Sequence, residues 1–528
     1  MIAAAADRRR PLTCVWILAV VATATSVAPA PELDREDREA LATALEARRL
    51  LGRTGNELWP GLGAARIPLL VFRRGEIAIL VGHPAPPQGY ETLTPSPSGS
   101  PSIAILHGED RTLTASTSAE VGGVVTALYS LGPRGGRPGA AGGAASGHPP
   151  AEEQIAGMVH EMFHVYSASK ARPPARDAAG RHPDSAEGLA LANLEGRLLA
   201  AAVDLPVPQA RGAARQLGAV RQARREILGA PVADELAADE FEEGLATYTE
   251  LEALRLGSQV AAGAALDGLP NFGGYRRWEW MREARLASLL VLLDDPAGLR
   301  SRGYVAGAAI ALLLDRIDPT WKGRAFGPER SLEALLAAAA PFRREEGPAL
   351  RREAFDRHGY PALLEQAQRD LAALVKRRES VLKEFEERPG FLVRVKVPEG
   401  GATRYRYDPQ NQADPGGTRI VHRRYLEVDL PGATFRALDA AALTEYGVAP
   451  PDIREVVFVA GDDAAWKVDG AIFYPRQGSL NAQTSLRIEA PGIVLEGGAA
   501  HLYMSGREVE VVFSPRPSDS AGGTPGSP

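Results

Sequence analysis

The stretch EEQIAGMVHEMFHVYSAS, residues 152–169, has the spacing of an amphipathic helix. At about 100° per residue, its apolar side chains fall on one broad face, which we expect to pack into a core. Measured around the helix from His160, His164 lies at about 40° and Glu161 at about 100°. All three side chains therefore lie on the side of the helix opposite the apolar face. The stretch therefore predicts a helix that presents two imidazoles and a carboxylate along one wall of a cleft. The apolar residues of its core face are Ile155, Met158, Val159, Met162, Phe163 and Tyr166.

His160 and His164 have the sequence spacing of two ligands to one metal ion. Imidazoles one helical turn apart can each give a nitrogen to a tetrahedral zinc ion at about 2.0 to 2.1 Å. Glu161 would then contact a water molecule rather than the ion, take its proton during attack on a carbonyl, and pass that proton to a leaving amine. Gly157, one turn earlier on the same face, is expected to leave room beside the site. The pattern predicts a zinc site with Glu161 as general base.

A third protein ligand is needed, because a catalytic zinc site combines three side chains with one open position. The only cysteine, Cys14, lies near the N-terminus, so the third ligand must be a histidine or a carboxylate. Glu243, within DEFEEGLATY at residues 239–248, is the preferred candidate because its flanking sequence is a clean helical pattern. Glu187 and Glu195 stand closer to the histidines in sequence and remain alternatives.

These residues resemble the gluzincin branch of zinc metallopeptidases, which includes thermolysin-like and aminopeptidase-like enzymes. In that branch an H-E-x-x-H helix is followed by a helix with the motif E-G-x-A-x-Y, which Glu243 to Tyr248 matches. The resemblance covers roughly residues 60–320. It implies a zincin-like catalytic domain in which His160, His164 and Glu243 are the zinc ligands. His164 and Glu243 are 79 positions apart, so a helical insertion is expected between them.

The resemblance also implies a donor for the oxyanion that forms during hydrolysis. Gluzincin-like enzymes take a tyrosine or histidine for this purpose from the later helical region, where Tyr304 begins a strongly apolar helix. Packing is an equal alternative for Tyr304, and His358 is a weaker candidate donor. The other histidines lack ligand spacing and are expected to be structural or on the surface; they are His83, His107, His148, His182, His422 and His501.

The remaining sequence predicts an α+β chain with a small N-terminal sheet, a mainly helical catalytic domain and a C-terminal all-β domain. A surface helix is expected over residues 31–51, ending near Gly52. The resemblance to gluzincins implies that the strand at 124–131 borders the cleft, where an extended peptide can add to the sheet edge. The other strands expected in the N-terminal sheet are residues 67–72, 77–81, 103–106 and 112–118.

Changes of composition predict the boundaries between these parts. Residues 31–131 are expected to form the N-terminal α/β part of the catalytic unit, and the Gly/Pro-rich residues 132–150 a flexible loop. Residues 151–388 are helical in pattern, apart from breaks at Pro and Gly clusters. Alternation with a period of two then predicts a β domain over 391–515, followed by a disordered tail over 516–528.

The first thirty residues have the pattern of an export signal. Arg8 to Arg10 form a positive segment, Leu12 to Ala22 an apolar one, and small residues suitable for cleavage follow. Since about eleven strongly apolar residues fall short of the roughly 20 that span a bilayer, removal or release is favoured over a membrane anchor. The sequence therefore predicts a secreted or periplasmic protein without stable membrane insertion after removal of residues 1–30.

Charge and motifs exclude other classes of function. A net charge of -6 and a pI near 6.0 do not fit a nucleic-acid partner, which requires a concentrated basic surface. Phosphate-binding loops, nucleophile elbows and dinucleotide-binding fingerprints do not occur in a suitable context. The expected function is an exported zinc-dependent peptidase acting on a peptide or protein. The alternative is an exported binding or scaffold protein that keeps a degenerate, non-catalytic peptidase fold.

Overall fold

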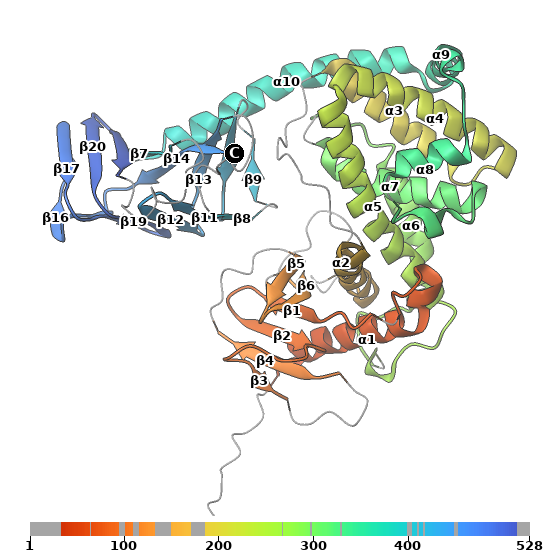
Figure 1. Cartoon of the computed structure of the whole chain (residues 1–528), viewed down its shortest axis with the longest axis horizontal. Coiled ribbons are helices and arrows are strands. Elements are labelled where there is room, and N and C mark those ends of the chain that lie inside the picture. Colours follow the sequence, from red (N-terminus) through yellow and green to blue (C-terminus); the bar gives the residue numbers. More distant parts are fainter. Residues whose placement is uncertain are drawn as a thin grey trace, which may run out of the picture.

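The computed structural model describes residues 33–514, apart from 64, 94–100, 109–115, 133–148, 171–184, 267, 296–297, 328–329, 399–403, 409–410, 415–417 and 448–451. The expected export signal at 1–30, nearly all of the loop expected at 132–150, and the tail at 516–528 lie outside these residues. In the described part, an N-terminal sheet, a helical region and a C-terminal region of strands follow one another along the chain (Figure 1). This order confirms the predicted α+β class.

The N-terminal sheet has six strands in the order β3-β4-β2-β1-β6-β5. The strands expected at 67–72 and 77–81 pair with each other as an antiparallel hairpin, β1 also pairs with β6 in parallel, and the other neighbours are antiparallel. The strands are β1 (Leu69–Arg73), β2 (Ile77–Val81), β3 (Glu91–Thr92), β4 (Ile103–His107), β5 (Thr117–Val121) and β6 (Val124–Ser130).

The expectation that residues 124–131 provide a sheet edge is wrong. Strand β6 is hydrogen-bonded on both sides, to β1 and to β5. The tight turn at Gly122 and Gly123 folds β5 back along β6, and both glycines have the positive φ that such a turn needs. The edge strand on this side of the sheet is therefore β5, whose first residues the sequence pattern placed in a strand over 112–118; of that range, 112–115 lie outside the described residues.

Helix α1 (Arg35–Leu58) differs from its prediction in both length and environment. It runs through Gly52 instead of ending there, and its side chains from Ala40 to Leu58 pack into the main core instead of lying on a surface. A glycine within a helix costs only about 1 kcal/mol, which the burial of an apolar face along six turns outweighs. Asp34 begins the helix by accepting a hydrogen bond from the amide of Asp37.

The helical region contains the predicted run of helices, of which α2 packs against β5 and β6 of the N-terminal sheet (Figure 1). One hydrophobic core joins α1, the sheet and the helices from Leu33 to Ala340. The apolar face predicted for α2 (Ala151–Lys170) is confirmed, since Ile155, Val159 and Phe163 are completely buried. The other helices are α3 (Ala186–Ala202), α4 (Val207–Leu228), α5 (Ala230–Gly257), α6 (Trp278–Ser288), α7 (Gly298–Ile317), α8 (Leu332–Ala339), α9 (Gly347–His358) and α10 (Tyr360–Glu386).

Helices α5 and α7 approach each other through two glycines. A Cβ atom on Gly244 would lie 2.5 Å from Cα of Gly307, and one on Gly307 would lie 2.3 Å from the carbonyl oxygen of Glu240. Real Cβ atoms do not approach other heavy atoms this closely, so only glycine fits at either position. The crossing fixes where the side chains next to Gly244 point, including that of Glu243.

The C-terminal strands form two sheets that pack face to face around a separate core from Val393 to Phe513. One sheet has the order β17-β20-β21-β7-β14-β13-β10-β9, and the other β16-β15-β18-β19-β12-β11-β8. Helix α10 connects this sandwich to the helical region: Leu363 and Ala367 pack on α3, whereas Phe385 packs on the outer face of the first sheet (Figure 1). The strands are β7 (Phe391–Lys396), β8 (Arg404–Tyr407), β9 (Gln412–Ala413), β10 (Arg419–His422), β11 (Tyr425–Leu430), β12 (Ala433–Leu438), β13 (Ala442–Tyr446), β14 (Ile453–Ala460), β15 (Ala465–Val468), β16 (Ala471–Phe473), β17 (Gly478–Ala482), β18 (Leu486–Ala490), β19 (Ile493–Gly497), β20 (Ala500–Ser505) and β21 (Glu508–Phe513).

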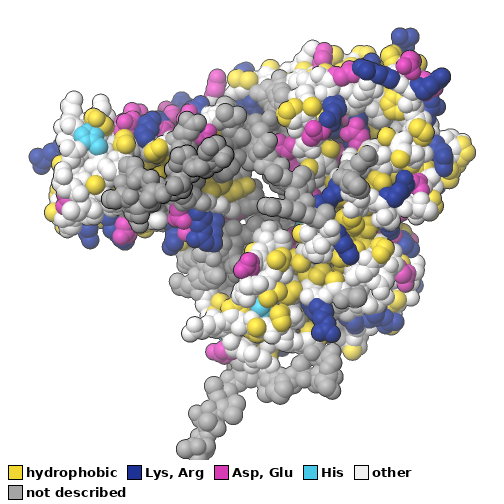
Figure 2. All heavy atoms as spheres, viewed as in Figure 1, with side chains coloured by type: hydrophobic (Ala, Val, Ile, Leu, Met, Phe, Trp, Pro, Cys, Tyr) yellow, Lys and Arg dark blue, Asp and Glu magenta, His cyan; other side chains and the backbone are white. Residues whose placement is uncertain are grey.

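None of the helices in the described part of the chain is both long enough and apolar enough to span a bilayer. On the face seen in Figure 2, basic and acidic side chains are intermixed.

The glycine contact predicts a clear difference between two Gly→Ala variants. Gly244→Ala should lower the free energy of unfolding by about 1 to 3 kcal/mol or more, because the new methyl group can be accommodated only if α5 and α7 separate. The control is Gly52→Ala in α1, where a Cβ meets nothing within 4 Å, and which should raise stability by roughly 0.5 to 1 kcal/mol. Denaturant unfolding of both variants measures these changes. Equal stability of the two variants would contradict the close crossing.

Candidate metal centre

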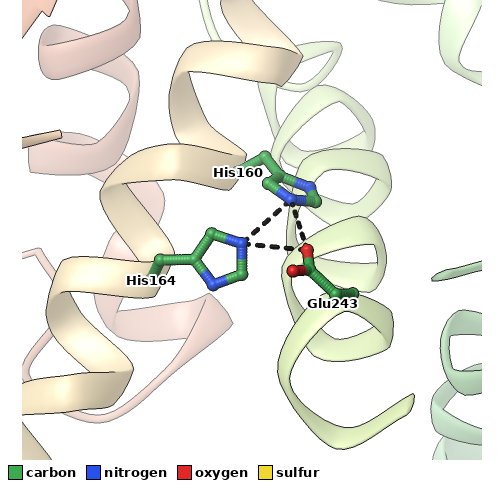
Figure 3. Close-up of side chains that lie close together, drawn as sticks. All are labelled: His160, His164 and Glu243. Carbon is green, nitrogen blue, oxygen red and sulfur yellow. Dashed lines mark hydrogen bonds and ion pairs between the residues drawn. The ribbon is translucent and has the colours of Figure 1, made fainter. Parts of the chain in front are cut away.

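Three potential metal ligands from two helices come together in the helical region. His160 and His164 lie on α2, and Glu243 lies on α5; their side chains point toward one another (Figure 3). Nε2 of His164 lies 3.1 Å from Nε2 of His160 and 3.1 Å from Oε2 of Glu243, and Nε2 of His160 lies 3.3 Å from the same oxygen. This group, which the sequence motifs singled out, could hold a metal ion.

The dimensions of this triangle suit a small divalent cation. Three donors placed tetrahedrally at about 2.0 to 2.1 Å from an ion are about 3.3 Å from one another. The observed separations of 3.1 to 3.3 Å agree with that value without movement of either helix. The side chains of His160, Glu243 and His164 are 11%, 14% and 20% exposed, so each of the three keeps some contact with solvent.

Local packing explains how the helices reach this position. The apolar face of α2 is buried in the core, which directs His160 and His164 away from it. Gly157 makes room, as expected, but the space is filled by the ring of Tyr129 from β6: a Cβ on Gly157 would lie 2.6 Å from that ring. The expectation that Gly157 leaves the site open is therefore corrected. Tyr129 contacts α2 one turn before His160, and burial together with the carboxylate of Glu161 raises the pKa of its phenol.

The rival ligands Glu187 and Glu195 are not part of the triangle. Glu187 lies in the first turn of α3 and is exposed. Glu195 is buried, but its carboxylate pairs with Arg224 at 3.1 Å and with Arg221 at 3.4 Å. Arg221 also makes two hydrogen bonds, of 2.7 and 2.8 Å, to Glu240 on α5. Glu195 thus belongs to a buried ion network that joins α3, α4 and α5. Helices α3 and α4 lie in the 79-residue segment between His164 and Glu243, and α5 carries Glu243.

Glu250 is a functional candidate that the sequence reasoning missed. Its Oε2 lies 3.4 Å from Nδ1 of His160, on the side of the ring opposite the metal-facing nitrogen. It follows Glu243 by seven residues on α5, which is two helical turns, so both carboxylates face α2. Carboxylates in this position orient a histidine ligand and raise its basicity. The i, i+7 spacing of the two glutamates was the available signal.

Glu161 lies beside the three ligands but is not hydrogen-bonded to them. Among the described residues, no hydrogen bond or ion pair holds its carboxylate, and the residue as a whole is 8% exposed. Burial raises the pKa of this carboxyl above its usual value, and the nearby imidazoles of His160 and His164 offset part of that rise. A carboxylate with a raised pKa and no fixed partner is suited to accept and return a proton.

Charges in the triangle are strongly coupled. Burial disfavours the charged form of His160, but its contacts with Glu243 and Glu250 outweigh this effect and raise the pKa of the imidazole to about 10. Burial also opposes ionisation of Glu243, yet hydrogen bonds from His160 and His164 hold the pKa of that carboxyl well below its usual range. Carboxylates therefore dominate the electrostatics around His160, which favours a bound cation.

The structure places the two tyrosines of the sequence analysis differently. Tyr304, on α7, lies with its ring nearly parallel to that of His160, at an angle of 9° and a centroid distance of 6.1 Å, so it borders the triangle. Tyr248, the last residue of the E-G-x-A-x-Y motif, is completely buried and donates a hydrogen bond to Asp315. It holds α5 against α7 rather than facing the ligands.

The other histidines are not members of the metal-binding group found within the described residues. His358 ends α9, and its backbone carbonyl accepts a hydrogen bond from Arg197. Of the histidines expected to be structural or on the surface, His83 and His422 are buried, whereas His148 and His182 lie outside the described residues. His107 lies at the end of β4, and His501 is on β20 beside Asn481.

Substitution of the acidic candidates distinguishes the third ligand. Glu243→Ala should reduce the affinity for a divalent transition metal by at least about 100-fold, because it removes one of three donors. Glu187→Ala is the matched control and should bind as the wild type does, since that carboxylate is exposed on α3. Competition with a chromophoric chelator measures both affinities. Loss of binding in the control but not in Glu243→Ala would overturn the assignment.

Comparison with known proteins adds no relative to this description: no family model matches the chain, and neither a curated protein nor a solved structure shows significant similarity to it.

Proposed function

We propose that the chain is an exported zinc-dependent peptidase that hydrolyses peptide bonds with Glu161 as general base. The observation that carries this proposal is the triangle of His160, His164 and Glu243, with the buried carboxylate of Glu161 beside it. The likeness of the H-E-x-x-H and E-G-x-A-x-Y segments to those of gluzincins supports the same function.

The donor set favours zinc among divalent cations. Two imidazoles and one carboxylate favour a transition metal over calcium and magnesium, which prefer oxygen ligands throughout, and the H-E-x-x-H spacing on one helix is typical of catalytic zinc. The triangle offers no sulfur ligand, which disfavours copper(I) and an iron–sulfur cluster at this site. Glu250, on the outer side of His160, provides the supporting carboxylate that zinc-binding histidines usually have.

Zinc held at this position would polarise a carbonyl group and lower the pKa of a coordinated water. Glu161 then accepts the proton that water loses on attacking the carbonyl carbon, and returns it to the nitrogen of the leaving amine. Its burial supports both steps, because a raised pKa brings the carboxyl closer to the pH at which it must accept and release a proton. Tyr304, beside His160, supplies a hydroxyl that can donate to the developing oxyanion.

Strand β5 supports a peptide as the substrate. It pairs with β6 alone among the described strands and lies with β6 against α2 (Figure 1). Its other edge offers backbone N–H and C=O groups to which an extended peptide can add as a further strand. The main chain of the substrate would provide this recognition, so it sets no strong preference for particular side chains.

Glu161→Gln tests the chemical role of the base separately from metal binding. The variant should keep the metal affinity of the wild type, because Glu161 is not a ligand, while kcat for peptide hydrolysis falls by about 100- to 10,000-fold. Zinc content after dialysis and cleavage of a broad peptide library are the two measurements. A metal-free, well-folded wild-type protein would support the scaffold alternative, and a metal-bound wild type inert towards the library would indicate a degenerate peptidase.

Tyr304→Phe separates oxyanion stabilisation from packing. The phenyl ring keeps the contact with His160 but lacks the hydroxyl, so kcat should fall by about 100- to 1,000-fold with little change in KM or zinc content. Steady-state kinetics on one cleaved peptide provides both constants. An unchanged kcat would assign Tyr304 to packing alone.

A further inference from the structure

The metal-facing triangle is connected to the molecular surface through a short chain of charged groups. Nδ1 of His160 lies 3.4 Å from Oε2 of Glu250, and the second oxygen of Glu250 accepts a hydrogen bond of 3.1 Å from Arg285 on α6. The side chain of Glu250 is 6% exposed, whereas that of Arg285 is 48% exposed. The chain of contacts therefore runs from a buried ligand, through a buried carboxylate, to a guanidinium in contact with water.

Helix α6 has other interactions that hold it in place. Met281 and Leu286 are buried, and Trp278 packs against the main core. Arg282 lies on the same helix, one turn before Leu286. It pairs with Asp204 at 2.7 Å, so its ion pair is separate from that of Arg285 with Glu250. Loss of the Arg285 side chain should consequently leave the helix in position, so its effect on the metal site can be separated from an effect on folding.

We propose that Arg285 is a positioning residue for the metal site and acts through Glu250. A carboxylate held by one oxygen can rotate about its last bonds, whereas Glu250 is held at both oxygens, by His160 and by Arg285. This arrangement fixes the acceptor for Nδ1, and therefore the direction in which Nε2 points into the triangle. Arg285 also provides the counter-charge that a buried carboxylate requires.

This inference rests on the metal-binding part of the proposed function and not on peptidase activity. Because Arg285 is half exposed, its attraction to Glu250 is subject to screening by salt, while the contact between Glu250 and His160 is shielded. The affinity of the site for a metal ion should therefore depend on ionic strength in the wild type, and less so in a variant without Arg285.

The experiment compares the wild type with Arg285→Gln, Arg285→Lys, Glu250→Gln and the double variant Arg285→Gln/Glu250→Gln. Arg282→Gln is the matched control, because it removes an ion pair from the same helix away from the ligands. Two quantities are measured on the intact chain: the affinity for zinc, by competition with a chelator, and the visible absorption spectrum of bound cobalt(II), which reports ligand geometry. Thermal unfolding of each variant verifies that it is folded.

Glu250→Gln should weaken zinc binding by about 10-fold or more, as loss of a supporting partner does in other zinc sites. Arg285→Gln should weaken it by a smaller factor, about 3- to 10-fold, and alter the cobalt spectrum, while Arg285→Lys restores part of both and Arg282→Gln changes neither. In the Glu250→Gln background, Arg285→Gln should have no further effect, because it acts through that carboxylate.

Two results distinguish the failure of this inference from failure of the metal site. Suppose that the wild type binds zinc, and that Arg285→Gln has the same zinc affinity and the same cobalt spectrum as the wild type and the Arg282→Gln control. Arg285 then has no positioning role. Additive losses in the double variant would likewise overturn action through Glu250. If the wild type binds neither zinc nor cobalt, the metal site itself is wrong, and the inference falls with it.

Discussion

The contact between Gly244 and Gly307 is the constraint on which the candidate metal centre depends. It allows α5 and α7 to cross with their backbones touching, which no other residue type at these positions would permit. Glu243, immediately before Gly244, is thereby directed at the histidines of α2, and Tyr304, one turn before Gly307, is brought against His160. One close approach of two helices thus places a ligand and a candidate oxyanion donor at the same site.

The sequence was sufficient where a periodic pattern decided the outcome. Three features follow from the spacing of apolar residues within a single helix or strand. They are the apolar face of α2, the strands β1 and β2, and the change from helices to strands after Pro389. Glu243 was preferred over Glu187 and Glu195 for its motif and for the helical pattern around it. The fold adds the reason that the rivals are engaged elsewhere: Glu195 pairs with Arg221 and Arg224, and Glu187 faces solvent. The residues around Glu195 in the sequence do not indicate that it forms ion pairs with Arg221 and Arg224 on another helix.

The wrong and missing expectations share a cause, which is that tertiary contacts override local signals. Gly52 indicated a helix end, yet α1 continues because its buried face extends to Leu58. The strand at 124–131 was expected at an edge, yet the turn at Gly122 adds β5 outside it. Glu250 and Tyr129 were overlooked because their importance arises from contacts with α2, to His160 and Gly157 respectively. Both contacts join residues that are far apart in the sequence.

The division of the three candidate ligands between α2 and α5 would couple the binding of a metal ion to folding. In an unfolded chain the two histidines lie four residues apart, whereas Glu243, 79 positions from His164, lies beside them only in the folded structure. An ion that prefers the folded site adds to its stability in proportion to the logarithm of free metal concentration, about 1.4 kcal/mol for each tenfold excess over the dissociation constant. The supply of metal after folding would then govern how long the chain resists unfolding and proteolysis.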